Sequence, residues 1–93
     1  MSDEIIRVTA FVHGYVQGVG FRWFTRAKAL ELGLIGSATN MGDGRVEIIA
    51  EGKADAVDAL MEWLRTGDTP GTVDDVVEQR AAPRHDLKGF NVR

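Results

Sequence analysis

Three glycines, at positions 14, 18 and 20, separate a segment typical of a strand from a segment typical of a helix. Glycine adopts positive φ angles without steric cost, so the backbone between these positions can turn sharply. Consecutive N–H groups of such a loop can point into one small concavity, which binds anions when it lies at the start of a helix. Arg22 follows directly, and its planar guanidinium suits a phosphate group. The loop therefore predicts a phosphate site.

The spacing excludes two better-known phosphate loops. A Walker loop ends in Gly-Lys-Ser or Gly-Lys-Thr, whereas this loop ends in Gly20-Phe21-Arg22. A dinucleotide fingerprint, Gly-x-Gly-x-x-Gly, would need a glycine where Trp23 stands. A chain of 93 residues also leaves no room for a Rossmann fold. The loop must therefore bind phosphate in another arrangement.

The segments on either side of the loop have clear periodicities. Residues 5–13 alternate between apolar and polar side chains and are rich in β-branched residues, which predicts a strand with one buried face. Residues 22–34 carry apolar side chains at three- and four-residue steps, which predicts an amphipathic helix with Gly33 near its end as a cap. We expect its buried stripe to consist of Phe24, Ala27, Leu30 and Leu34.

A hairpin follows the first helix. Residues 34–40 and 45–51 predict two strands, and the Asp43-Gly44 pair between them is a strong hairpin signal. The second of these strands alternates cleanly, so one set of its side chains should face the core and the other should face outward. The inward set is Val46, Ile48 and Ala50, and the outward set is Arg45, Glu47 and Glu51.

The last third of the chain contains a second helix and two more strands. The helix should bury a stripe formed by Ala54, Val57, Leu60, Met61 and Leu64. Residues 73–81 predict a strand, and Phe90 and Val92 suit a short final strand.

The order of these elements predicts an α+β fold. Both helices have one apolar face and the strands are half-polar, so two helices on one face of an antiparallel sheet bury every apolar surface. This is the ferredoxin-like split βαβ sandwich, with right-handed crossovers and a short additional C-terminal strand. The first and third strands should be central neighbours, with the second at an edge. We expect residues 1–93 to form a single domain.

Composition narrows the function. The 11 basic and 14 acidic residues give a net charge of −3, which argues against a nucleic-acid-binding protein, because such a protein needs a basic face. Cysteine is absent, and His13 and His85 have no partners at metal-ligand spacing, so we expect neither a metal nor a cofactor. Without a signal peptide or membrane span, we expect a cytoplasmic monomer with no membrane partner.

Two runs of residues resemble the signatures of the acylphosphatase family. The first is VHGYVQGVGFR, from Val12 to Arg22. The second is GSATN at residues 36–40, followed at the family's spacing by Gly44, Val46 and Gly52. The ending FNVR, residues 90–93, resembles the family's last strand, so that the resemblance covers essentially the whole chain.

The resemblance implies a ferredoxin-like hydrolase that needs no metal. It would split the carboxyl–phosphate bond of a small acyl phosphate, releasing a carboxylate and inorganic phosphate. By matched position, Arg22 would bind the phosphate and Asn40 would hold the attacking water. The loop backbone would complete a phosphate cradle at Tyr15, Val16, Gln17, Gly18, Val19 and Gly20.

The chain departs from the family pattern at two positions, and two other functions stay open. Ser37 replaces a large aromatic residue and Thr39 a residue that is often basic, which bears on rate or substrate preference. A module that binds acyl or carbamoyl phosphate without hydrolysing it efficiently would need the same cradle. An RNA-binding ferredoxin-like domain would need exposed aromatic residues on its central strands. Only Phe11 is available there, beside a partly acidic third strand, which disfavours RNA.

Overall fold

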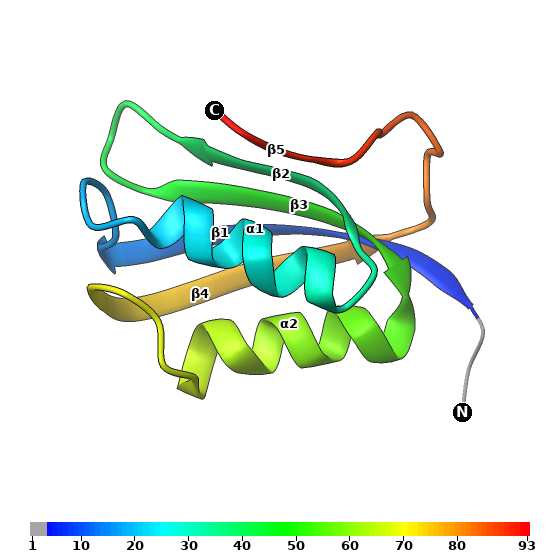
Figure 1. Ribbon diagram of the computed structural model, residues 1–93, viewed down its shortest axis with the longest axis horizontal. Helices are drawn as coiled ribbons and strands as arrows, with labels where there is room; N and C mark the ends of the chain where they lie inside the picture. The colour runs from blue at the N-terminus through cyan, green and yellow to red at the C-terminus, as the bar shows by residue number, and fades with distance from the viewer. Residues whose placement is uncertain (1–3) are drawn as a thin grey trace.

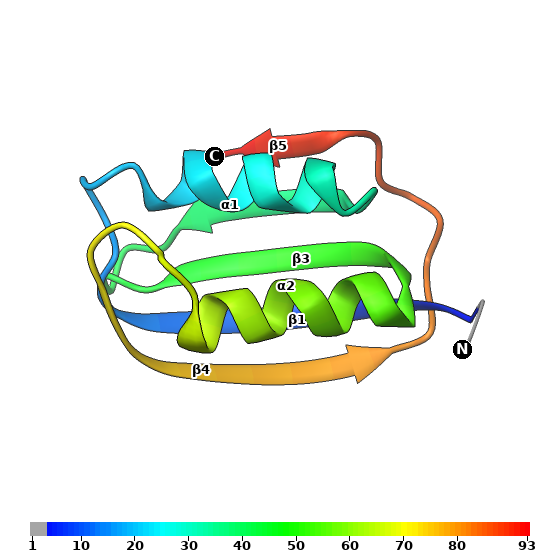
Figure 2. The same cartoon turned by 60° about the horizontal axis from the view of Figure 1, so that its bottom comes forward.

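The structure, a computed structural model that describes residues 4–93, has two layers (Figure 1). One layer is a sheet of five strands, and both helices pack on the same face of it (Figure 2). The strands are β1 Ile5–Tyr15, β2 Ile35–Asn40, β3 Val46–Lys53, β4 Thr72–Ala81 and β5 Phe90–Val92. The helices are α1 Phe21–Glu31 and α2 Ala54–Thr66. The α+β ferredoxin-like fold is therefore confirmed.

The sheet order is β4-β1-β3-β2-β5, and one pairing differs from the prediction. The central neighbours β1 and β3 are antiparallel, as expected. The predictions that β2 lies at an edge and that the sheet is wholly antiparallel are wrong, because β5 pairs with β2 in parallel. The chain reaches β5 through residues 82–89, which cross from the β4 side of the sheet to the opposite edge (Figure 1).

The core lies between the sheet and the helices. The buried face predicted for β1 and the inward set predicted for β3 meet there in register, with Val8 opposite Ala50 and Val12 opposite Val46. The stripe predicted for α2 is also confirmed, apart from the half-buried Ala54 at the first position. Its buried members are Val57, Leu60, Met61 and Leu64.

The stripe predicted for α1 is wrong except for Leu34, which is buried but lies beyond the helix end at Glu31. Phe24 and Leu30 are 58% and 44% exposed, and Ala27 is exposed as well. The helix begins at Phe21 and buries the row of residues at four-residue steps, namely Phe21, Thr25 and Ala29. Thr25 can be buried because its hydroxyl donates a hydrogen bond to the Phe21 carbonyl at 2.9 Å, within the helix. Gly33 follows the helix end with φ 77°, as a cap requires.

On the helix-free face of the sheet, one side chain predicted to face outward is buried. Glu51 does point away from the helices, but it is only 2% exposed. Its carboxylate accepts hydrogen bonds from the Arg7 guanidinium at 2.7 Å and from the backbone N–H groups of Arg84 and His85 at 3.1 and 3.3 Å. The crossover of residues 82–89 therefore covers this part of the sheet, which the alternation within β3 could not indicate.

Candidate active site

Residues 16–20 form the loop between β1 and α1. Gly18 and Gly20 have φ angles of 76° and 81°, in the left-handed region that glycine adopts most readily. The side chain of Val16 is buried, and Val19 packs against the core. Two apolar side chains thus anchor a loop whose backbone makes the turn from the strand into the helix.

No group among residues 4–93 caps the N-terminus of α1. Gly20 is the N-cap residue, no described side chain bonds to the helix start, and the first turn contains no acidic residue. The first N–H groups of a helix lack partners inside the helix and carry a partial positive charge. Together with the loop amides, this helix start is suited to hold an external anion.

The base of the loop is supported by the connection between α2 and β4. Gly71 has a φ angle of 75°, and a Cβ atom there would overlap the carbonyl oxygen of Tyr15 and crowd a methyl group of Val19. The loop, this connection and the turn between β2 and β3 all lie at one end of the molecule, on the left of Figure 1. Tyr15 itself is the last residue of β1, and its side chain is exposed.

Arg22 lies in the first turn of α1 and is half-buried. Its Nη1 donates to the backbone oxygen of Arg93 at 2.5 Å, and its other N–H groups have no partner among residues 4–93. Four other arginines pair with side-chain carboxylates, namely Arg7, Arg45, Arg65 and Arg80. The positive charge of Arg22 therefore has no carboxylate side chain to balance it in the described chain, and remains available to an anion.

Asn40 ends β2 and lies beside Arg22. Its backbone N–H donates to the same Arg93 oxygen at 3.1 Å. Arg93 in turn donates its N–H to the Ala38 carbonyl at 2.8 Å, which continues the parallel pairing of β2 with β5. The Arg22 guanidinium and the Asn40 backbone N–H therefore lie close together, because both donate to the same oxygen.

The side-chain oxygen of Asn40 is buried and has no hydrogen-bond partner among residues 4–93. Buried acceptors in proteins are nearly always paired, either with protein groups or with water. This oxygen is thus an acceptor suited to a water molecule.

The turn after Asn40 contains a balanced ion pair. Asp43 accepts from the Arg45 backbone N–H at 3.1 Å and from its Nε at 2.8 Å. The backbone N–H of Arg45 is the main cause that lowers the pKa of Asp43, and slight burial opposes it. The Arg45 guanidinium also lies over the Phe11 ring, 4.8 Å from its centre. Arg45 thus balances the charge of Asp43, close in sequence to Asn40.

Two contributions to this site have no counterpart in the sequence predictions. One is the backbone oxygen of Arg93, which no side-chain pattern could indicate. The other is the side chain of Gln17, which we expected to act only through its backbone. Its amide donates to the carbonyls of Met41 and Arg45 at 2.8 and 2.9 Å. A long amide side chain within a glycine loop was the one available signal for it.

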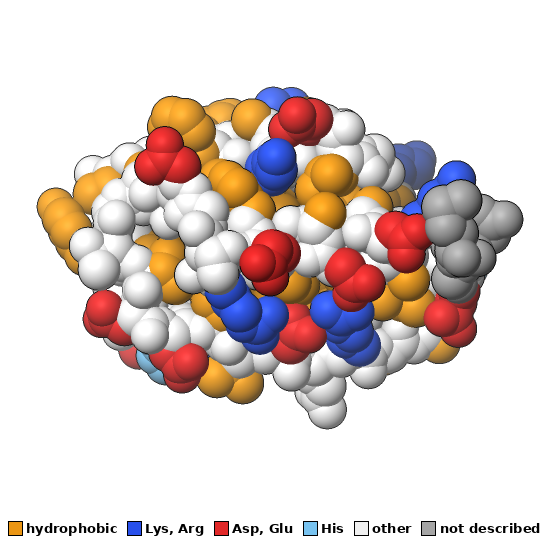
Figure 3. Space-filling model, turned by 90° about the horizontal axis from the view of Figure 1, so that it is seen from below, with side chains coloured by type: hydrophobic (Ala, Val, Ile, Leu, Met, Phe, Trp, Pro, Cys, Tyr) orange, Lys and Arg blue, Asp and Glu red, His pale blue; other side chains and the backbone are white. Residues whose placement is uncertain are grey.

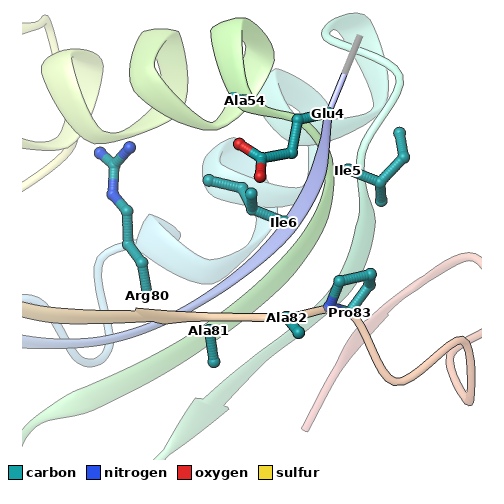
Figure 4. Close-up of a pocket in the computed structure, with 8 residues that line it drawn as sticks. All are labelled: Glu4, Ile5, Ile6, Ala54, Arg80, Ala81, Ala82 and Pro83. Carbon is teal, nitrogen blue, oxygen red and sulfur yellow. The ribbon is translucent and has the colours of Figure 1, made fainter. Parts of the chain in front are cut away.

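One hollow in the described chain is a weaker candidate for an anion site. It has a volume of about 510 Å³ and lies at the start of β1, away from the loop (Figure 4). The Arg80 guanidinium that lines it is already held by Asp58 and Glu78. Acidic and basic side chains are interspersed on the side seen in Figure 3. Within residues 4–93 no three His, Cys, Asp or Glu side chains could hold a metal ion, and no helix could span a membrane.

Comparisons with known proteins agree with the geometry. The family model described as Acylphosphatase matches residues 8–92. The acylphosphatase of Rhodococcus jostii strain RHA1 is 64% identical over 84 residues, 90% of this chain and 94% of that protein. The structure of acylphosphatase from Bacillus subtilis matches with a TM-score of 0.88 and 33% identity, covering 95% of this chain and 98% of that one. An acylphosphatase from Coxiella burnetii gives 0.87 and 37%, covering 97% and 94%.

Proposed function

This chain belongs to the acylphosphatase family and is an enzyme, and from that premise we propose how it hydrolyses acyl phosphates. In our proposal the amides of residues 15–20 and the Arg22 guanidinium hold the phosphoryl group, and Asn40 orients the attacking water, without a metal ion. The observation that carries the proposal is the shared Arg93 oxygen, which joins Arg22 and Asn40.

The chemistry needs little more than these groups. An acyl phosphate is an activated mixed anhydride whose leaving group is a stable carboxylate. The enzyme must therefore hold the phosphoryl oxygens, balance their charge and place one water in line with the bond that breaks. The Arg22 guanidinium supplies a positive charge and planar N–H donors, and the start of α1 adds partial positive charge.

Asn40 orients the water but does not take its proton. Its amide can accept from and donate to a water molecule, yet it is neutral and not a base at neutral pH. As the water oxygen bonds to phosphorus, the bond from phosphorus to the carboxyl oxygen breaks and its electron pair leaves with the carboxylate. The protons of the water pass to phosphate oxygens or to solvent, so the reaction requires no enzyme group that titrates near neutral pH.

An isotope experiment tests this reaction directly. Wild-type protein would hydrolyse benzoyl phosphate in ¹⁸O-labelled water with EDTA present, and both products would be analysed by mass spectrometry. Because water attacks phosphorus, we expect the label in inorganic phosphate and none in benzoate. Label in benzoate would show attack at the carbonyl carbon, and turnover that stops with EDTA would show that a metal is needed. Either result would contradict the proposal.

A further inference from the structure

Gln17 connects the loop between β1 and α1 to the turn that follows Asn40. Its side-chain Nε2 donates to the Met41 carbonyl at 2.8 Å and to the Arg45 carbonyl at 2.9 Å. A primary amide has just these two N–H donors, so both are used. These bonds join positions 24 and 28 residues apart in the sequence. Two carbonyl acceptors around one nitrogen also leave no doubt about which end of the amide faces them.

The two acceptors lie at the mouth of the turn that follows Asn40. Met41 is the next residue along the chain, and Arg45 is the last residue before β3. The Met41 N–H donates to the Arg45 carbonyl at 2.8 Å and closes the turn. The Gln17 amide therefore contacts both sides of the hairpin mouth directly beside Asn40.

We propose that Gln17 is a positioning residue, which fixes the phosphate cradle relative to the water held by Asn40. This inference rests on the proposed function, since it concerns how two parts of that site are aligned. The cradle comes from the connection between β1 and α1, whereas Asn40 comes from β2. The strands β1 and β2 are not adjacent in the sheet, because β3 lies between them. In-line attack needs a fixed distance between the water and phosphorus, and small displacements are costly.

The hairpin does not need Gln17 in order to fold. The Arg45 carbonyl keeps its bond from the Met41 N–H, and the Met41 carbonyl accepts from the Gly44 N–H at 3.2 Å. The loop keeps its buried Val16 anchor. Losing the Gln17 amide thus leaves no carbonyl of the turn without a protein partner, so alignment should suffer more than stability.

A double-mutant cycle tests the inference. Gln17→Met keeps the length of the side chain and removes both donors. Gln79→Met is the matched control, because Gln79 is exposed on β4 and lies opposite Thr9, away from the loop. Each variant would be made in wild type and in Asn40→Ala. The measurements are kcat and KM for benzoyl phosphate, the inhibition constant of inorganic phosphate, and the melting temperature.

We expect Gln17→Met to lower kcat by roughly tenfold to a hundredfold, with the inhibition constant of inorganic phosphate close to that of wild type. In Asn40→Ala the same change should cost little more, because the water that Gln17 helps to align is no longer held. Gln79→Met should match wild type in every measurement. A purely structural role would instead lower the melting temperature and reduce activity equally in both backgrounds.

Other results would overturn the inference in distinguishable ways. An inactive wild type would refute the proposed function, and the inference with it. If wild type is active, two results would refute the inference alone. One is full kcat in Gln17→Met, and the other is a loss of kcat in the double variant that equals the product of the losses in the two single variants. If Gln17→Met does not fold, NMR of wild type decides. Slow exchange of the Gln17 side-chain amide, with scalar couplings across its bonds to Met41 and Arg45, would support the inference, and fast exchange would overturn it.

Discussion

A single backbone oxygen organises the site at the scale of residues. The Arg93 oxygen accepts from the guanidinium of Arg22 and from the backbone N–H of Asn40, so one acceptor places a cation beside the end of β2. Arg22 gives this oxygen one donor and keeps the others free among residues 4–93. In our proposal these free donors hold the phosphoryl group.

Asn40 gives a prediction that separates binding from chemistry. Asn40→Ala removes the amide that we propose to orient the water, but not its backbone bond to Arg93. We therefore expect kcat for benzoyl phosphate to fall by about a hundredfold or more, while inorganic phosphate still binds. Steady-state kinetics with phosphate as inhibitor measure both effects. Asn91→Ala, at an exposed asparagine of β5, is the control. A variant that loses phosphate binding but keeps kcat would reverse the assigned role.

Residue types predicted part of this site and missed the rest. The glycines at 18 and 20 and the nearby Arg22 indicated an anion site at a helix start. The structure places them there, and no group among residues 4–93 caps that helix start. The role of each residue in catalysis stays a prediction. The bonds of the Gln17 side chain and the position of the Arg93 oxygen depend on which loops meet in space. No local pattern in a single sequence indicates such a meeting.

At the scale of elements, the crossover of residues 82–89 depends on one buried ion pair. Arg7 on β1 and Glu51 on β3 are direct cross-strand partners, and the Glu51 carboxylate also binds the backbone of the crossover at Arg84 and His85. Burial, the largest single influence, raises the pKa of Glu51. The bonds from Arg84, Arg7 and His85 together outweigh it and lower the pKa below its ordinary value of 4.5.

This pair predicts a dependence of stability on pH. Since folding lowers the pKa of Glu51, its contribution is complete above about pH 4.5 and is lost as the pH falls through the lowered value. Glu51→Gln should lower the free energy of unfolding by about 3 kcal/mol at neutral pH. This loss is at the low end for a broken buried pair, because Asp86 still faces Arg7. It should also flatten the loss of stability in acid. Urea unfolding at several pH values measures both effects.

The matched control is Glu47→Gln, on the same strand and the same face as Glu51. Glu47 is half-buried, and its carboxylate has no hydrogen bond or ion pair with the rest of residues 4–93, so its variant should differ little from wild type. Equal losses in the two variants, or a Glu51→Gln protein as stable as wild type at neutral pH, would contradict the role given to the pair.

The sequence predicted the alternating faces of the strands and the cap of α1. It did not predict which face of α1 turns toward the sheet. The faces of β1, β3 and α2 follow directly from their apolar periodicity. In α1 two rows of residues compete. The row that is buried contains Phe21 and the smaller side chains of Thr25 and Ala29, while Phe24 remains exposed. Small side chains allow closer approach of the helix to the sheet, a packing effect that residue hydrophobicity alone does not capture.

At the scale of the whole molecule, the ends of the sheet differ. The glycine loop, the turn after Asn40 and the connection before β4 gather at one end, whereas the crossover to β5 begins at the other (Figure 1). The order of the elements predicted the two-layer fold but not β5 beside β2, because three residues carry too little pattern to reveal a partner. That pairing brings the Arg93 oxygen to the site.

The most direct test of the account is the hydrolysis of benzoyl phosphate by wild type and Arg22→Ala, with EDTA present. The control is Arg84→Ala, whose exposed side chain has no bond to the rest of residues 4–93. We expect fast, metal-independent turnover in wild type and in the control. Arg22→Ala should be folded and slower by about a hundredfold to a thousandfold, the usual cost of losing one preorganised donor. A folded Arg22→Ala enzyme with wild-type turnover would contradict the central claim.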